Sequence, residues 1–417
     1  MLKTIRDIHF AGKKVLVRVD YNVPIKDGKI TDNTRITATL PTLQHLLEQG
    51  AALILLSHLG RPKGEMNTKY SLAPVAEALA KLLKQPVTLT QDVAGPQSLK
   101  AAEALKPGEV LLLENLRFDP GEEKDSQELA GRLKALAGPF GVYVQDAFAA
   151  LHRAHASVHA LPLMMKDRVI GFLVEKELAA LQRVQENPDR PFVAILGGAK
   201  ISDKVDVIRN FMHRADIVLI GGALANTFVK SLGGEVGASV VESSSVKAGQ
   251  TEKNYVATAA LLLEESKAFV PALSSSQPLA RVMLPIDLVS ASAAEAGAKT
   301  KVVKWASQKI KPDWTFLDLG PETVRVYAEV IAQARSIFWN GPLGMCEVPP
   351  FDSGTRAVAK AVAANTHAFR VVGGGDTEAV VKQFGMYDQF DHVSTGGGAS
   401  VAYVAGEKLP GLEALEG

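Results

Sequence analysis

The chain has 417 residues, of which 47% are hydrophobic, so it is long for one hydrophobic core and predicts about two or three globular domains. Its 46 Lys and Arg residues balance 45 Asp and Glu residues, so the net charge favours neither nucleic acid nor an anionic membrane as a partner. A single cysteine, Cys346, excludes an internal disulfide and a cysteine metal cage. The charged N-terminal stretch and the absence of a run of membrane-spanning length predict a soluble, cytoplasmic protein.

Short apolar runs alternate with helical patterns along almost the whole chain. Runs rich in Val, Ile and Leu without polar alternation are typical of strands in a parallel sheet that is covered on both faces. We expect strands at 14–19, 51–57, 87–90, 110–114, 142–145, 192–196, 217–220, 282–284, 337–339, 369–372 and 392–395, and helices at 71–84, 126–136, 256–267, 353–364 and 378–384. The pattern predicts an α/β fold with two doubly wound, parallel-sheet (Rossmann-like) domains.

A helical pattern at 171–184 is the expected connection between the domains. It ends at Asn187-Pro188, where proline blocks its continuation. We therefore expect an N-terminal domain at 1–170, an interdomain helix at 171–187 and a C-terminal domain at 188–405, with any relative motion hinged at the ends of the helix. The alternative is an ordinary surface helix within one domain.

Cationic side chains follow several strands of the first half of the chain. They are Arg18, Arg35, His58, Arg61, Arg117, His152, Arg153 and His155. Any one of them could be a solvated loop cation, but the carboxyl ends of neighbouring parallel strands meet at one edge, where several guanidiniums repel one another unless an anion neutralises them. The group predicts a ligand with phosphate and carboxylate groups, which arginine binds bidentately. Asp20 and Asn22 stand where a substrate hydroxyl could be held, or they form an ordinary turn.

The second half carries glycine-rich turns after its strands. Gly373, Gly374 and Gly375 precede Asp376 and Thr377 and a helical pattern, so backbone N–H groups and a helix N-terminus predict a phosphate site. Because Asp376 would repel a bare phosphate, its presence favours Mg²⁺ between the two, unless Asp376 is simply a helix N-cap.

A second glycine turn holds Gly198, Ala199 and Lys200, with Lys204 expected one helical turn further on and on the same face. The spacing is not that of a P-loop, and two solvated lysines are the alternative. Gly221 and Gly222 offer a flat surface for an adenine or ribose. Further along the chain, two side chains are placed to contact a phosphate oxygen and a ribose hydroxyl, respectively Asn340 and Glu347.

Together these segments resemble the phosphoglycerate kinase family. The resemblance runs from Val15 to the C-terminus and is carried, in the expected order, by RVDYNVP, HLGRP, ENLRF, HRAHAS, GGAKISDK, WNGPLG, GGGDT and STGGGAS. It implies an N-terminal domain that binds 3-phosphoglycerate or 1,3-bisphosphoglycerate and a C-terminal domain that binds Mg²⁺ with ADP or ATP. It also implies a monomer whose last residues, about 406–417, pack on the N-terminal domain.

The resemblance assigns roles by position. Arg35 and Lys200 would lie at the transferring phosphoryl group, with backbone donors from Gly373 and Gly374, and Asp376 would bind the metal. The implied substrate contacts are Arg18, Asp20, Tyr21, Asn22, Arg35, His58, Leu59, Gly60, Arg61, Arg117, His152, Arg153 and His155. The implied nucleotide contacts are Gly198, Ala199, Lys200, Lys204, Gly221, Gly222, Asn340, Glu347, Gly373, Gly374, Gly375, Asp376 and Thr377.

Three short segments depart from the family pattern: Ala149-Ala150-Leu151, Ala223 and Met345-Cys346. None removes a charged residue that the chemistry needs, so we expect activity with an altered fit of the nucleotide. The implied nucleophiles are ionised at neutral pH, so no general base is expected. The rival interpretations are a dehydrogenase, which lacks its GxGxxG fingerprint here, and a catalytically inactive binding protein.

Overall fold

The computed structural model describes residues 2–202, 204–245, 253–268 and 282–416. The chain divides into two compact units, which are described separately below. Unit 1 comprises Met1–Ala179 and Glu407–Gly417, and unit 2 comprises Ala180–Gly406. Within the described residues, no helix is both long and apolar enough to cross a membrane.

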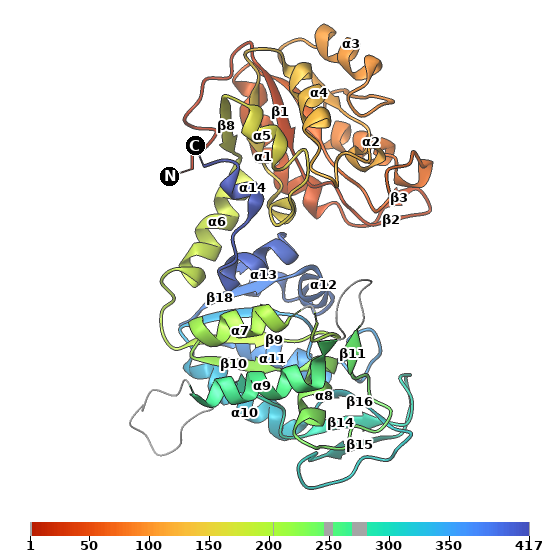
Figure 1. Ribbon diagram of the computed structural model, residues 1–417, viewed down its shortest axis with the longest axis vertical. Coiled ribbons are helices and arrows are strands. Elements are labelled where there is room, and N and C mark those ends of the chain that lie inside the picture. The colour runs from red at the N-terminus through yellow and green to blue at the C-terminus, as the bar shows by residue number, and fades with distance from the viewer. Residues whose placement is uncertain (1, 203, 246–252, 269–281, 417) are drawn as a thin grey trace. The chain divides into compact units, whose positions relative to one another are not determined.

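Unit 1 is built on a six-stranded parallel sheet with the order β5-β6-β4-β1-β7-β8 (Figure 1). Its strands are β1 (Lys14–Arg18), β4 (Ala52–Leu56), β5 (Val87–Leu89), β6 (Val110–Leu112), β7 (Val142–Gln145) and β8 (Asp167–Ile170), and β2 (Ile25–Lys26) and β3 (Lys29–Ile30) form a hairpin. Its helices are α1 (Thr34–Glu48), α2 (Ala73–Leu83), α3 (Pro96–Ala104), α4 (Gln127–Ala137), α5 (Ala160–Met164) and α14 (Pro410–Glu413), with short 3₁₀ turns η1 (Thr68–Tyr70), η2 (Leu116–Phe118) and η3 (Phe148–Ala150). The central strand β4 is buried along its whole length, because helices cover both faces of the sheet.

Unit 2 contains a second six-stranded parallel sheet with the order β13-β10-β9-β17-β18-β19. Its strands are β9 (Phe192–Leu196), β10 (Ile217–Ile220), β13 (Val282–Met283), β17 (Ser336–Asn340), β18 (Phe369–Gly373) and β19 (His392–Val393). A separate antiparallel sheet holds β14 (Leu288–Ala291), β15 (Thr300–Val303) and β16 (Thr315–Leu319), and β11 (Ser244–Ser245) pairs with β12 (Lys253–Asn254). The helices are α7 (Val205–Arg214), α8 (Gly222–Ser231), α9 (Tyr255–Ala268), α10 (Pro321–Gln333), α11 (Ser353–Ala364), α12 (Gly375–Gln383) and α13 (Gly398–Ala405), with the 3₁₀ turn η4 (Tyr387–Gln389).

The predicted α/β class with two parallel sheets is confirmed. Strands lie where the apolar runs predict them, with ends shifted by one or two residues. The antiparallel sheet of unit 2 was not predicted, because β15 is mostly exposed and β16 alternates buried and half-buried residues, so neither makes an apolar run. Helix α1 begins at Thr34, next to Arg35, and continues through Pro41, which lies inside it.

The predicted connector corresponds to α6 (Phe172–Gln185), and the division between the units falls within it. Its first turn is fixed to unit 1 by hydrogen bonds. The backbone N–H of Leu173 donates to Asp146 Oδ1 at 3.0 Å, and that of Phe172 donates to Thr42 Oγ1 at 2.9 Å. These side chains satisfy two of the donors that a helix N-terminus leaves without intrahelical partners.

The C-terminal residues belong to unit 1. The N–H of Gly411 in α14 donates to Leu151 O at 3.0 Å. A Cβ atom at Gly411 would lie 2.7 Å from Val158 Cγ1. The close approach explains why glycine stands there.

In unit 2, the loops that follow β9, β10 and β17 pack backbone against backbone. Gly197 N donates to Asn340 O at 2.8 Å, and Gly198 N donates to Pro342 O at 3.0 Å. A Cβ atom on Gly197 would lie 2.1 Å from Pro342 O. Glycine is therefore required at this position for the three loops to meet.

We expect the substitution Gly197→Ala to lower the free energy of unfolding by about 2 kcal/mol or more, because the added methyl group forces these loops apart. Urea denaturation of the purified variant tests this. The matched control is Gly131→Ala, whose Cβ atom in α4 would have nothing within 4 Å. It should stabilise the protein by up to about 1 kcal/mol. Equal midpoints for Gly197→Ala and the unsubstituted protein would contradict this account of the loops.

Candidate functional site

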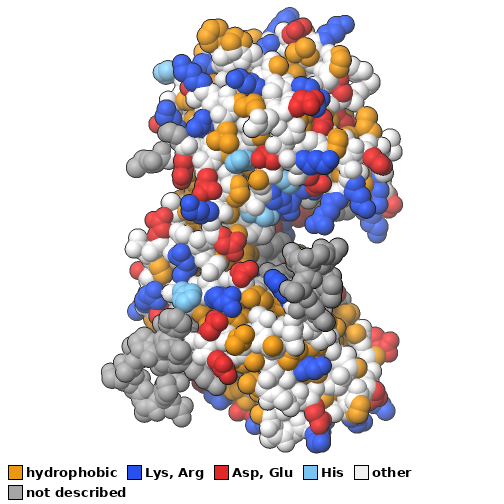
Figure 2. Space-filling model, in the orientation of Figure 1, with side chains coloured by type: hydrophobic (Ala, Val, Ile, Leu, Met, Phe, Trp, Pro, Cys, Tyr) orange, Lys and Arg blue, Asp and Glu red, His pale blue; other side chains and the backbone are white. Residues whose placement is uncertain are grey.

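Unit 1 gathers its predicted cationic residues where the carboxyl ends of β1, β4, β6 and β7 meet. Figure 2 shows Lys, Arg and His side chains collected along one edge of this unit. The acid Asp20 lies among them: Arg35 Nη1 contacts Asp20 Oδ2, and His58 Nδ1 lies 3.9 Å from Asp20 Oδ1. Burial alone would raise the pKa of Asp20, but the guanidiniums of Arg35 and Arg18 hold it below its usual value. Asp20 is therefore a carboxylate at neutral pH.

Arg18 lies behind this edge. Its side chain has no exposed surface. Its guanidinium donates from Nε to Ser157 Oγ at 2.8 Å, from Nη1 to Val19 O, and from Nη2 to His58 Nδ1 at 3.1 Å. The structure thus places Arg18 as a support for His58 and not in an exposed position to contact a ligand.

His58 is a neutral imidazole in this arrangement. A guanidinium can only donate, so His58 Nδ1 accepts and the ring proton is on Nε2. Burial lowers the pKa of His58 well below its usual value, and the nearby arginines add to the shift against the opposing charge of Asp20. His58 therefore offers a neutral hydrogen-bonding group within a cationic cluster.

The loop after β4 is held by the ends of β1 and β6. Gly60 N donates to Asn22 Oδ1 at 2.9 Å, and Arg117 Nη1 donates to Gly60 O at 2.7 Å. Arg117 Nε lies 3.1 Å from Glu123 Oε1. The two groups form an ion pair but not a hydrogen bond. The neighbouring Leu59 is buried and bonds through its backbone to Asn115.

The predicted substrate residues do not all lie on the surface of this edge. Tyr21 is fully buried, and its hydroxyl lies 3.0 Å from Thr39 Oγ1. Its ring therefore belongs to the core, although the family resemblance assigned it as a substrate contact. Arg61 is exposed, and its charge lowers the pKa of Arg153 after the larger effect of burial.

The segment after β7 adds two more imidazoles. Arg153 Nε donates to His152 Nε2 at 3.1 Å, and His155 Nδ1 lies 3.9 Å from Glu122 Oε1. Burial, reinforced by neighbouring arginines, lowers the pKa of His152 to about 4 and that of His155 to about 3. Glu122, which the sequence reasoning missed, is fully buried here. The acidic run 119–125 was the available signal for it.

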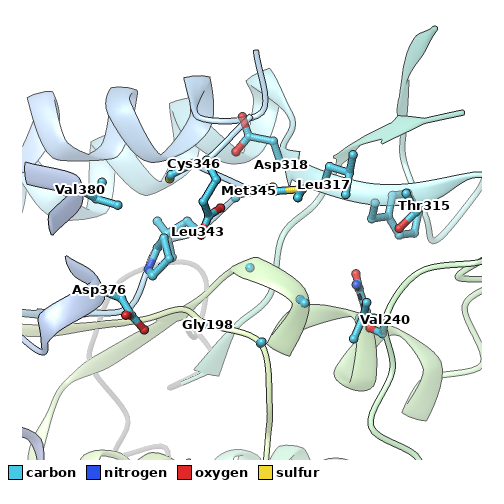
Figure 3. Close-up of a pocket in the computed structure, with 18 of the residues that line it drawn as sticks. Gly198, Val240, Thr315, Leu317, Asp318, Leu343, Met345, Cys346, Asp376 and Val380 are labelled. Atoms are coloured by element: carbon cyan, nitrogen blue, oxygen red, sulfur yellow. Dashed lines mark hydrogen bonds between the residues drawn. The ribbon is translucent and has the colours of Figure 1, made fainter. Parts of the chain in front are cut away.

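Unit 2 contains a cavity of about 520 Å³ (Figure 3), within the range typical of small-molecule sites. Asp376 lies at one end of it, and Thr315 and Val240 lie at the other. Of the predicted nucleotide residues, those that line the cavity are Gly198, Ala199, Gly222, Glu347 and Asp376. The walls are mostly apolar and include Leu288, Phe316, Leu317, Leu343 and Met345. Sequence reasoning did not assign these walls to the site, apart from noting Met345 as a departure, because several come from the unpredicted antiparallel sheet.

The GGGDT segment ends β18 and begins α12. Gly374, with a φ of +94°, is the N-cap, so the alternative interpretation of Asp376 as N-cap is wrong. Thr377 is buried, and its Oγ1 accepts from Gly341 N at 2.6 Å and donates to Gly373 O at 3.0 Å. Asp376 stands in the first turn, beside backbone N–H groups that have no intrahelical partner.

The two lysines of the GGAKISDK segment do not share a helical face. Helix α7 begins at Val205, so Lys200 lies in the preceding loop, where it is exposed. Lys204 Nζ donates to Asn340 Oδ1, and Asn340 Nδ2 donates to Gly373 O at 2.8 Å. The prediction that Lys204 lies one helical turn beyond Lys200 and on the same face is wrong, because α7 begins only after Lys204, which is its N-cap.

Among the described residues, no group of three or more His, Cys, Asp or Glu side chains is arranged to hold a metal ion. The carboxylate of Asp376 stands in the first turn of α12, and one or two protein carboxylates together with substrate phosphates and waters are the ligands that Mg²⁺ usually takes. Asp376 is the carboxylate at the helix start, where phosphates would also bind.

Comparison with known proteins gives consistent results. A family model described as phosphoglycerate kinase matches residues 5–407. The chain is 49% identical over 415 residues to the phosphoglycerate kinase of a Roseiflexus species, with 99% of this chain and 98% of that protein covered. It is also 49% identical over 416 residues to the phosphoglycerate kinase of Thermus thermophilus, with both chains covered in full.

Solved structures agree. The phosphoglycerate kinase from Coxiella burnetii superposes with a TM-score of 0.83 at 36% identity, covering 100% of this chain and 99% of that chain. The enzyme from Pyrococcus horikoshii OT3 gives a TM-score of 0.82 at 33% identity, covering 100% and 98%. The resemblance drawn from the motifs is confirmed.

The imidazoles of unit 1 predict a pH dependence of stability. Free histidine titrates near pH 6.5, whereas the pKa of His152 is about 4 and that of His155 about 3 in the folded protein. Between about pH 6.5 and 4 the unfolded chain binds more protons, so these residues make the folded state less stable as the pH falls. We expect a His152→Gln, His155→Gln double variant to lose less stability than the unsubstituted protein between pH 7 and 5. Urea midpoints that fall in parallel for both proteins would show the expectation to be wrong.

Proposed function

Because the chain belongs to the phosphoglycerate kinase family, we propose that it catalyses reversible transfer of a phosphoryl group from 1,3-bisphosphoglycerate to ADP, giving 3-phosphoglycerate and ATP. Enzymes of this family are kinases with a carboxyl group as acceptor and act in glycolysis. We further propose that this chain works as a cytoplasmic monomer. A coupled assay that detects ATP formed from the two substrates tests the activity directly.

The arginine cluster of unit 1 is the observation that supports a binding site for the phosphoglycerate substrate. Arg35, Arg61, Arg117 and Arg153 lie at one edge of the sheet, and the imidazoles beside them are neutral. Phosphate and carboxylate oxygens would neutralise the guanidiniums through paired hydrogen bonds. Asp20, which the arginines keep ionised, would accept a hydrogen bond from the substrate hydroxyl.

The cavity of unit 2 supports the nucleotide site. Its apolar walls suit a purine base, and Glu347 among its lining residues would accept from a ribose hydroxyl. The phosphates would run toward the N-terminus of α12, where unpaired N–H groups and the helix dipole favour negative charge. Lys204, held by Asn340, and the exposed Lys200 would add positive charge near them.

Asp376 would hold Mg²⁺ together with the nucleotide phosphates. When bound, the cation neutralises charge on the phosphate oxygens. This chain's own residues do the rest: Arg35 and Lys200 stabilise the charge spread over the transferring group, and backbone N–H groups at Gly373 and Gly374 orient it. The attacking carboxylate or phosphate oxygen is already ionised near pH 7, so no residue has to remove a proton.

The phosphoglycerate substrate and the nucleotide are assigned to different units. Transfer of the phosphoryl group therefore requires that the two units bring these substrates together. We propose that this motion hinges at the ends of α6 and excludes water from the reacting groups. Small-angle X-ray scattering with and without both substrates tests it. Unchanged dimensions with both substrates bound would rule out closure.

We expect Arg35→Ala to reduce kcat by roughly a thousandfold or more, the scale of effect for an arginine that stabilises a transferring phosphoryl group. The dissociation constant for ADP should stay within about twofold, because the nucleotide site lies in the other unit. Steady-state kinetics and calorimetry measure the two quantities. Arg132→Ala removes an exposed arginine of α4 and should leave both unchanged. A fully active Arg35→Ala variant would refute the role of Arg35.

Asp376→Asn should weaken binding of ADP in the presence of Mg²⁺ by roughly tenfold or more, since the neutral amide is a poor ligand for the cation. Binding of ADP in EDTA should not weaken, because no cation then bridges the side chain to the phosphates. Calorimetric titrations with and without Mg²⁺ compare the two. Glu378→Gln, which changes a carboxylate of the same helix that pairs with Lys382, is the matched control. Equal loss in EDTA would contradict a metal-binding role.

A further inference from the structure

Glu122 occupies an unusual position beneath the cationic edge of unit 1. It lies in the turn between η2 and α4 and has no exposed surface. Buried carboxylates are rare unless they are paired and hydrogen-bonded. The contacts of Glu122 therefore indicate its role.

The carboxylate of Glu122 binds one residue of the segment after β7. Its Oε2 accepts from Ser157 N at 2.9 Å, and its Oε1 accepts from Ser157 Oγ at 2.6 Å. The backbone adds a third bond, because Ala156 N donates to Glu122 O at 2.9 Å. This turn thus fixes the end of the segment 152–157, which carries His152, Arg153 and His155.

The same carboxylate reaches Arg18 through the serine hydroxyl. Ser157 Oγ accepts from Arg18 Nε at 2.8 Å while it donates to Glu122 Oε1. Arg18 Nη2 also lies 4.0 Å from Glu122 Oε1 and 3.1 Å from His58 Nδ1. A continuous chain of contacts therefore runs from Glu122 through Ser157 and Arg18 to His58.

The contacts from Glu122 to His58 also bear on the charge of the buried Arg18. Arg18 is fully buried, and an unpaired buried guanidinium is costly. Asp20 Oδ1 lies 3.9 Å from His58 Nδ1 and Asp20 Oδ2 contacts Arg35, so Asp20 is not available to Arg18 alone. Glu122 Oε1 lies 4.0 Å from Arg18 Nη2. Burial raises the pKa of Glu122, while the charge of Arg18 and the hydrogen bonds from Ser157 act in the opposite direction and favour the carboxylate that would balance Arg18.

We propose that Glu122 is a positioning residue for the acid substrate: through Ser157 and Arg18 it sets the place of His58 and of the segment that carries Arg153. The proposal rests on the proposed function, because it assumes that the arginine cluster binds a phosphoglycerate. Glu122 touches no substrate itself. Its effect should appear in the affinity for the acid and not in the affinity for the nucleotide.

The test compares Glu122→Gln and Ser157→Ala with the unsubstituted protein. Glu122→Gln keeps the size of the side chain and removes its charge, whereas Ser157→Ala keeps both charges and removes the hydroxyl that links them. Glu128→Gln, an exposed carboxylate at the start of α4, is the control for a change of charge. Calorimetry measures the dissociation constants for 3-phosphoglycerate and ADP, and denaturation with urea measures the folded fraction.

We expect both variants to bind 3-phosphoglycerate roughly tenfold more weakly, the scale of a lost hydrogen bond to a charged group. Their dissociation constants for ADP should be unchanged, and Glu128→Gln should match the unsubstituted protein in both. The KM for the acid substrate should rise more than kcat falls.

The outcomes separate the proposals. If both variants are folded and bind 3-phosphoglycerate as tightly as the unsubstituted protein, the positioning role of Glu122 is refuted. The same holds if they only lower the urea midpoint while the folded protein keeps its affinity, since that is a purely structural effect. If Glu122→Gln does not fold, Ser157→Ala decides the question alone. If the unsubstituted protein itself fails to bind 3-phosphoglycerate, the proposed function is refuted instead.

Discussion

Repulsion between cations is the constraint on which unit 1 depends. Parallel strands bring their carboxyl ends to one edge, and this chain places arginines and histidines after four of them. The structure limits the repulsion in two ways. Burial keeps His58, His152 and His155 neutral, and two buried acids lie among the arginines, with Asp20 beside Arg35 and Glu122 near Arg18. The remaining guanidiniums are left for an anionic ligand.

In unit 2 the constraint is the small space between three loops. Three loops after its strands approach so closely that main-chain atoms touch, and glycine is needed where Gly197 faces Pro342 and where Gly341 faces Gly197. This packing holds Asn340 in reach of both Lys204 and Gly373. The cavity beside these loops is lined by apolar side chains and has Asp376 at one end. Unit 2 thus presents backbone donors and carboxylates, Glu347 and Asp376 among them, whereas unit 1 presents guanidiniums.

The edge of unit 1 is also linked to the start of the connecting helix. Asp146 N donates to Arg18 O at 2.8 Å, and Asp146 Oδ1 accepts from Leu173 N in the first turn of α6. The backbone that carries the buried Arg18 therefore also holds the residue that caps α6. In the proposed mechanism, this connection joins the acid site to the element about which closure would occur.

Local sequence was sufficient for the class of fold and for much of the chemistry. Apolar runs predict strands because parallel strands are buried on both faces, as β4 and β9 are. Residues directly after such runs, among them Asp20, Arg117 and Asp376, could be placed at the sheet edges for the same reason. The family motifs then gave each of them a role, and the comparisons confirm the family.

Tertiary structure decided which of these side chains face outward and what they touch. Arg18 ends β1 and Tyr21 lies one residue beyond Asp20, yet the side chains of Arg18 and Tyr21 are fully enclosed, whereas Asp20 keeps a small exposed surface. Glu122 meets Ser157 across 35 positions of sequence. Several walls of the cavity come from the antiparallel sheet, whose strands do not form the continuous apolar runs of the parallel sheets. Pattern along a chain reflects the burial of each segment, whereas the partner of a buried charge depends on segments that only folding brings together.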